Sequence, residues 1–169
     1  MADKIVNRVA NSQLKTIDLE DFYPLGLRTV IDIKSWLFHE QILKETDFRE
    51  SLKNHDWSQY KNNYVALTCS SDAIIPSWAY MLITTYVSLF AKKVVVGNLK
   101  ELETSIFQEV ISNFSIEEFK YKPVIIKGCS HKPIPETAYI QLIEKLLPVA
   151  KTIMFGEACS TVPLYKNKK

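Results

Sequence analysis

Apolar and polar positions follow two different patterns along the chain, and the change lies near residue 60. Before it, Leu27–Ile33 alternates and is rich in β-branched residues, which predicts a strand. The apolar run Trp36–Leu43 is interpreted as its antiparallel hairpin partner. Thr46–Asn54 then predicts a short helix, because Thr46 can cap it and Phe48 and Leu52 share one face.

After residue 60, short apolar runs alternate with amphipathic segments. The runs predict strands at Tyr64–Thr68, Lys93–Val96, Pro123–Ile126 and Thr152–Phe155, and the segments between them predict helices at Pro76–Phe90, Lys100–Asn113 and Pro135–Leu147. Strands that are apolar on both faces and alternate with helices are typical of a parallel sheet covered on both sides. We expect a single α/β domain over residues 1–169. Residues 1–60 would form a hairpin and helix extension, and residues 61–169 a duplicated core.

The duplication is visible as an internal repeat. Residues 76–97 align without a gap on residues 135–156, at an offset of 135 − 76 = 59. The identical pairs are Pro76/Pro135, Ala79/Ala138, Tyr80/Tyr139, Ala91/Ala150, Lys92/Lys151 and Gly97/Gly156. Each copy follows a predicted strand and a Cys-Ser pair. The core therefore consists of two βαβ units.

All three cysteines share this context, since Cys69, Cys129 and Cys159 each come one to four residues after a predicted strand and precede a serine. Right-handed βαβ connections would place all three loops at the carboxyl edge of one sheet, where α/β proteins bind ligands. Three thiolates can hold zinc or an iron–sulfur cluster. The further candidate ligands are His131, Asp72 and Glu157, and the candidate surrounding residues are Ser70, Ser130, Ser160 and Trp78.

Two other interpretations stay open. A thiolate at a helix N-terminus, at Cys69 or Cys129, would suit a thiol-dependent enzyme or a sulfur carrier. Alternatively, the cysteines only pack, and the chain is a non-catalytic interaction module. The sequence contains no recognisable set of a catalytic nucleophile and its base, so whether the chain is an enzyme stays open. His39 and His55 are interpreted as surface or packing residues.

Composition narrows the function classes. The 169 residues are 47% apolar and 24% charged, with a net charge of +2, which gives no reason to expect nucleic acid or an acidic membrane as partner.

No run reaches the ~18 apolar residues of a membrane span, and the start lacks a signal peptide, so we expect a cytoplasmic protein. Three cysteines there favour metal or thiol chemistry over a disulfide. The four scattered glycines predict no nucleotide cofactor. The oligomeric state is not predicted.

Longer strings carry a family resemblance. They are Asn7–Ser12, His55–Tyr60, Val65–Ser70, Ile75–Tyr80, Lys127–Ser130 and Gly156–Lys166. With them the chain resembles, nearly end to end, a bacterial family known only as a domain of unknown function, number 2480. The resemblance implies no reaction and no catalytic residues. An expected association of the family's genes with iron–sulfur assembly implies a role in sulfur or cluster handling, with a protein of that assembly as partner.

Overall fold

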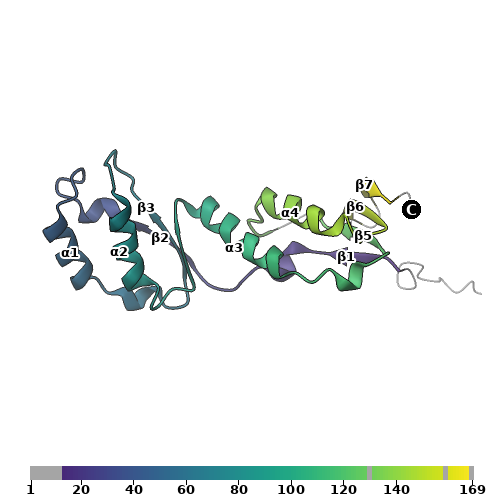
Figure 1. Cartoon of the computed structure of the whole chain (residues 1–169), viewed down its shortest axis with the longest axis horizontal. Helices are drawn as coiled ribbons and strands as arrows, with labels where there is room; N and C mark the ends of the chain where they lie inside the picture. The colour runs from purple at the N-terminus through teal and green to yellow at the C-terminus, as the bar shows by residue number, and fades with distance from the viewer. Residues whose placement is uncertain (1–12, 129–130, 158–159, 168–169) are drawn as a thin grey trace, which may run out of the picture. The chain divides into compact units, whose positions relative to one another are not determined.

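The computed structural model of the chain describes residues 13–128, 131–157 and 160–167 (Figure 1). The chain divides into two compact units. Unit 1 consists of Met1–Tyr23 and Phe107–Lys169, and unit 2 consists of Pro24–Ile106. The boundary predicted near residue 60 therefore falls inside unit 2. No helix in the described ranges is long and apolar enough to cross a membrane.

Unit 2 contains a three-stranded parallel sheet in the order β2 (Arg28–Asp32), β3 (Tyr64–Thr68), β4 (Lys93–Val96). Helices α1 (Glu45–Asn54) and α2 (Ser77–Val87) share a core with Val65 and Leu67 of the sheet. Ala66, which alternates with them, packs instead with Leu102 and Ile106 of α3 (Leu99–Asn113). Helices therefore cover both faces of this sheet. The 3₁₀ helices η2 (Ile33–Trp36) and η3 (Trp57–Tyr60) complete the unit.

Unit 1 contains a four-stranded sheet in the order β1 (Lys15–Ile17), β5 (Pro123–Ile126), β6 (Thr152–Glu157), β7 (Ser160–Lys166). The first three strands are parallel, and β7 is antiparallel to β6. Helix α4 (Glu136–Leu146) and the second part of α3 pack on the sheet through Leu142, Leu146, Phe107 and Ile111. The unit also holds the 3₁₀ helices η1 (Leu19–Phe22) and η4 (Glu117–Phe119).

The predicted repeat is present as repeated structure. Pro76 and Pro135 each stand just before a helix with the same φ of −69° and with ψ of 147° and 141°. Gly97 and Gly156 have φ of +136° and +121°, which an L-residue rarely adopts. Gly97 directly follows β4, and Gly156 is the last residue but one of β6. The two copies therefore share their helix start and a glycine with positive φ near the end of the strand that follows the helix.

The repeat extends further toward the N-terminus than the sequence identities indicate. At the same offset of 59, the fully buried Phe48 and Leu52 of α1 correspond to Phe107 and Ile111 of α3. Asn62 and Tyr121, also 59 apart, have φ of +63° and +59° although their side chains differ. Both donate their backbone N–H to equivalent carbonyls, at Phe90 and Val149. Units 1 and 2 are therefore two versions of one structural module.

The fold class is confirmed as mixed α/β with mainly parallel strands, and the helix expected from Thr46 is α1. The N-terminal hairpin is wrong. β2 pairs in parallel with β3, from Arg28 opposite Tyr64 to Asp32 opposite Thr68. The physical reason is Asp32, whose carboxylate accepts the N–H of Lys34, so that the chain leaves the strand and enters η2.

The two copies also build two sheets rather than one. Each copy pairs with its own strand from the N-terminal part of the chain, β2 for unit 2 and β1 for unit 1. A strand's apolar pattern predicts that it lies in a sheet, but does not identify the neighbour that it pairs with.

Candidate functional site

The carboxyl edges of the two sheets begin in the same way. Asp32 ends β2, and Asp18 directly follows β1. Each carboxylate accepts the backbone N–H of the residue two positions on, at 3.0 Å from Lys34 and from Glu20. Each edge therefore starts with an aspartate that ends a strand and caps a 3₁₀ helix.

At the edge of unit 2, Cys69 directly follows β3 and is half-buried. Its Sγ lies 3.2 Å from Ser71 Oγ. Ser70 binds the Asp32 carboxylate, through its backbone N–H at 3.1 Å and its hydroxyl at 2.5 Å. Burial acts to raise the pKa of Asp32, but the hydrogen bonds from Ser70 and Lys34 outweigh it and lower that pKa below its ordinary value. Asp32 is therefore a charged anchor for the loop that carries the thiol.

Lys34 adds a positive charge beside this loop. Its Nζ lies 2.9 Å from the Glu40 carboxylate. The hydrogen bond and charge of Glu40 raise the pKa of Lys34, and Asp32 and Cys69 contribute in the same direction. Lys34 is thus an ammonium group beside the loop that carries Cys69.

A cleft of about 520 Å³ lies against Asp32 and Ser70. Its other lining residues are Val30, Ile31, Lys34, Ser35, Trp36, Glu40, His55 and Tyr60. Inside it, His55 Nε2 lies 2.8 Å from the Tyr60 hydroxyl. Burial lowers the pKa of His55, against the nearby charge of Asp56, and burial together with Asp56 raises the pKa of Tyr60. A neutral imidazole accepting the tyrosine O–H fits both shifts.

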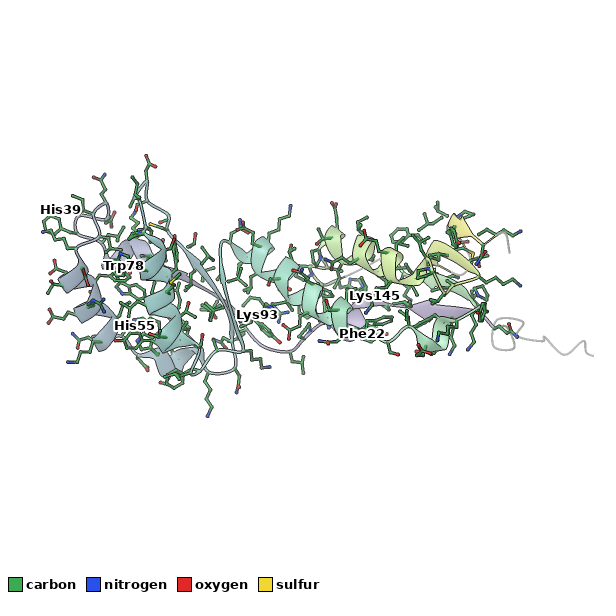
Figure 2. The ribbon with its side chains drawn as sticks, in the orientation of Figure 1. Phe22, His39, His55, Trp78, Lys93 and Lys145 are labelled. Atoms are coloured by element: carbon green, nitrogen blue, oxygen red, sulfur yellow. The ribbon has the colours of Figure 1, made fainter. Side chains whose placement is uncertain are left out.

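Aromatic rings hold this histidine in place. His55 packs edge-on against Trp57 at 4.7 Å and Trp36 at 5.2 Å between ring centroids, and it stacks on Tyr60 at 5.7 Å. Figure 2 shows His55 in the part of the chain formed by α1 and α2. The cleft therefore combines apolar ring surface with a few polar groups, as small-molecule sites do.

The edge of unit 1 has a different set of charges. Lys127, which follows β5, lies 3.1 Å from Asp18, and the hydrogen bond and charge of Asp18 raise the pKa of Lys127, with help from Glu157. Glu20 accepts the backbone N–H groups of His131 and Lys132. These contacts fix the ends of the loop between β5 and α4. Cys129, Ser130 and Cys159 lie outside the described residues.

The remaining predicted site residues lie in different places. Trp78, which Figure 2 labels, lines another hollow together with Asp72 and Ile74. Its ring packs edge-on against Phe48, with 5.9 Å between ring centroids. Glu157 ends β6, opposite Ser160 of β7. Ser71, rather than Ser70, contacts the Cys69 sulfur. Over residues 13–128, 131–157 and 160–167, no group of three His, Cys, Asp or Glu side chains could hold a metal ion.

Three strand-to-helix loops meet at one carboxyl edge only where their strands belong to one sheet. Cys69 follows β3 of the three-stranded sheet, whereas Cys129 and Cys159 come after β5 and β6 of the four-stranded sheet. Cys129 and Cys159 therefore follow strands of the same sheet, whereas the convergence of Cys69 with them stays a prediction.

Sequence reasoning missed Asp32, His55 and Tyr60. A signal for Asp32 was present, because Ile31-Asp32-Ile33 repeats the pattern of Ile17-Asp18-Leu19. For the cleft, the cluster of His, Trp and Tyr within His55–Tyr60 was a compositional hint, although nothing in it indicated that the rings meet Trp36.

Comparison with known proteins gives one match. A family model described as "Protein of unknown function (DUF2480)" matches residues 3–167. No curated protein and no solved structure matches the chain. Because the match covers nearly the whole sequence, the chain belongs to the protein family of unknown function DUF2480.

Proposed function

We propose that this protein is a cytoplasmic accessory protein that binds a metal ion or an iron–sulfur cluster through cysteine thiolates at the carboxyl edge of unit 1. The observation that carries the proposal is the pairing of β5 with β6. These strands are parallel neighbours, with Ile126 directly opposite Phe155. Cys129 comes 129 − 126 = 3 residues after the first, and Cys159 comes 159 − 155 = 4 residues after the second.

The described residues around this edge support the proposal. The aromatic ring of Phe155 lies against Gly128, because a Cβ at Gly128 would come within 2.6 Å of it. The loop before Cys129 therefore passes close to the end of β6. Glu157 and His131 are the further candidate ligands, and thiolate, imidazole and carboxylate are the donors that zinc takes. Thiolates alone would hold an iron–sulfur cluster.

Charge supports the same assignment. Lys127 carries a positive charge beside Asp18 and Glu157. It would offset part of the negative charge that two thiolates bring to the edge. The partner in this proposal is a protein of iron–sulfur assembly that receives or delivers the bound group.

Cys69 favours a second candidate function. Its sulfur contacts Ser71, and its neighbour in sequence, Ser70, binds Asp32. Ser70, Asp32 and the Lys34 ammonium all line the cleft. A thiol among a hydroxyl, a cation and a cleft suits a thiol-dependent enzyme or sulfur carrier. Cys69 would then act separately from the two cysteines of unit 1.

Metal and acid-labile sulfide analysis of protein purified without oxygen tests the first proposal. We expect close to one equivalent of metal or cluster in the wild type, and a loss of roughly tenfold or more in Cys129→Ser and in Cys159→Ser. Cys69→Ser is the matched control and should retain the metal. Less than about one-tenth equivalent in the wild type, or retention in both unit 1 variants, refutes the proposal.

Alkylation by iodoacetamide tests the second candidate. Ser71→Ala should change the rate at which Cys69 is modified and leave Cys129 and Cys159 unchanged, because the Ser71 hydroxyl contacts the Cys69 sulfur. Equal rates at Cys69 in the wild type and in Ser71→Ala would remove the reason for this function.

A further inference from the structure

The two units differ at one edge of their sheets. In unit 1, strand β6 carries β7 as an antiparallel neighbour over Thr152–Glu157. The equivalent strand of unit 2 is β4, 59 residues earlier, and after Gly97 the chain enters α3 instead. Within the described ranges, β4 pairs only with β3. Unit 2 therefore lacks the strand that completes the corresponding sheet in unit 1.

Equivalent residues of β6 and β4 differ in how deeply they are buried. Ile153 of β6 lies opposite Tyr165 of β7 and is fully buried, at 0% exposed. Its equivalent in β4, Val94, is only partly buried. Val96 is 55% exposed, whereas its equivalent Phe155 is partly buried. The difference in burial at these two positions follows the presence or absence of a neighbouring strand.

The open edge of β4 is largely apolar, with one charged residue, Lys93, at its start. Val94, Val95 and Val96 form an uncharged β-branched run, which pairs readily with another strand. By contrast, β7, an outer strand of the unit 1 sheet, contains Pro163, a residue that protects edges because it has no N–H to donate. Beside β4, a largely apolar hollow of about 600 Å³ is lined by Tyr80, Met81 and Val96, with Ser77 and Thr84. Met81 is 67% exposed.

Backbone alternation shows which groups face outward. The N–H of Gly97 donates to the carbonyl of Leu67, and Leu67 lies opposite Val96 in the parallel ladder. Because successive residues of a strand face opposite neighbours, the N–H of Val95 faces β3, as that of Gly97 does, and the N–H groups of Val94 and Val96 face the open edge. Val94 and Val96 therefore each offer a donor and an acceptor to an added strand.

We propose that β4 pairs antiparallel with β4 of a second copy of this chain, which joins two three-stranded sheets across a twofold axis. In the register centred on Val95, Val95 lies opposite its counterpart and Val94 lies opposite Val96. Lys93 lies opposite Gly97, so no like charges meet. The antiparallel direction is the one that β7 takes on β6. A self-complementary edge of this kind gives the isologous interface of a closed dimer, and Met81 and Val96 would be covered in it.

Sedimentation of the full chain over a range of concentrations tests the proposal. We expect the wild type to dimerise, and Val96→Glu to weaken the dimer at least about tenfold, because the substitution acts twice across the axis. Val94→Pro should act similarly by removing an outward N–H. Ile140→Glu is the matched control and should dimerise like the wild type, since Ile140 is the unit 1 equivalent of Met81 and is 61% exposed.

Amide hydrogen exchange gives a second measurement. Protection of the Val94 amide should rise with protein concentration in the wild type and should not rise in Val96→Glu. A wild type that stays monomeric, or a Val96→Glu variant that dimerises as tightly as Ile140→Glu, overturns the proposal. A dimer that leaves Val94 exchange unchanged overturns it as well, because the copies would then meet elsewhere.

Discussion

The ion pair between Arg28 and Glu103 should contribute much more to stability than the ion pairs on the surface. Arg28 Nε lies 2.6 Å from Glu103 Oε1, and the two side chains are only 12% and 9% exposed. The remaining guanidinium nitrogens are also engaged, because Nη1 donates to the carbonyls of Pro24 and Gly26 at 2.7 Å each and Nη2 donates to Glu103 Oε2 at 3.4 Å. The pair joins the first residue of β2 to α3, and it lies within unit 2.

Glu103→Ala leaves the Arg28 charge largely buried. Removing one partner of a buried pair costs about 3–5 kcal/mol, but Arg28 keeps its two carbonyl partners, so we expect a loss of about 2–4 kcal/mol. Glu45→Ala is the control, because Glu45 and Arg49 form a similar contact at 2.9 Å with side chains 62% and 54% exposed. That exposed pair, together with the position of Glu45 in the first turn of α1, should contribute less than about 1 kcal/mol.

Urea unfolding monitored by tryptophan fluorescence measures both changes, since all three tryptophans, Trp36, Trp57 and Trp78, lie in unit 2. Added salt should reduce the small effect of Glu45→Ala and leave that of Glu103→Ala nearly unchanged. If Glu103→Ala loses no more stability than Glu45→Ala, burial does not decide the strength of these pairs and the reasoning is refuted.

Two other predictions concern His55 and the duplicated cores. Because the folded pKa of His55 is below its ordinary 6.5, its contribution to the free energy of unfolding is complete above about pH 6.5 and is lost as the pH falls through the folded pKa. Urea titrations should show a shallower loss in His55→Gln, and parallel pH profiles would contradict this. Phe48→Ala removes a ring from the core of unit 2 and should lower the free energy of unfolding measured by fluorescence by ~3–5 kcal/mol. Phe107→Ala removes a ring from the core of unit 1 and should lower the midpoint measured by circular dichroism without changing the midpoint measured by fluorescence. Equal fluorescence shifts would show that the two cores unfold together.

The strands and helices after residue 60 could be predicted because their apolar runs are long and their breaks are marked by proline or glycine. The predicted strands Tyr64–Thr68, Lys93–Val96 and Pro123–Ile126 agree with β3, β4 and β5 to the residue. β1 was not predicted, since three residues are too few to show a period. The hairpin prediction was wrong because a single aspartate, Asp32, ends the strand. In the sequence, a capping aspartate is a weaker signal for the end of a strand than an apolar run is for its continuation.

The repeat was found where residues are identical and missed where only geometry is shared. Asn62 and Tyr121 have nearly the same φ and equivalent backbone contacts, yet no chemistry in common. The cleft could not be predicted for a similar reason. His55 and Tyr60 are close in sequence, but Trp36 and Asp32 reach them only because β2 and β3 are paired. That pairing joins residues that no local pattern connects.

The interruption of unit 1 by unit 2 has a consequence for the order of folding. Lys15 of β1 pairs opposite Val124 of β5, 124 − 15 = 109 positions away, and the whole of Pro24–Ile106 lies between them. A chain emerging from the ribosome therefore releases a complete, contiguous module before β5 has been synthesised. Until then, β1 lacks the strand with which it pairs in the folded chain. Closing so long a loop costs chain entropy and slows the pairing of β1 with β5. Early folding of the intervening module shortens the effective length of the loop that has to close.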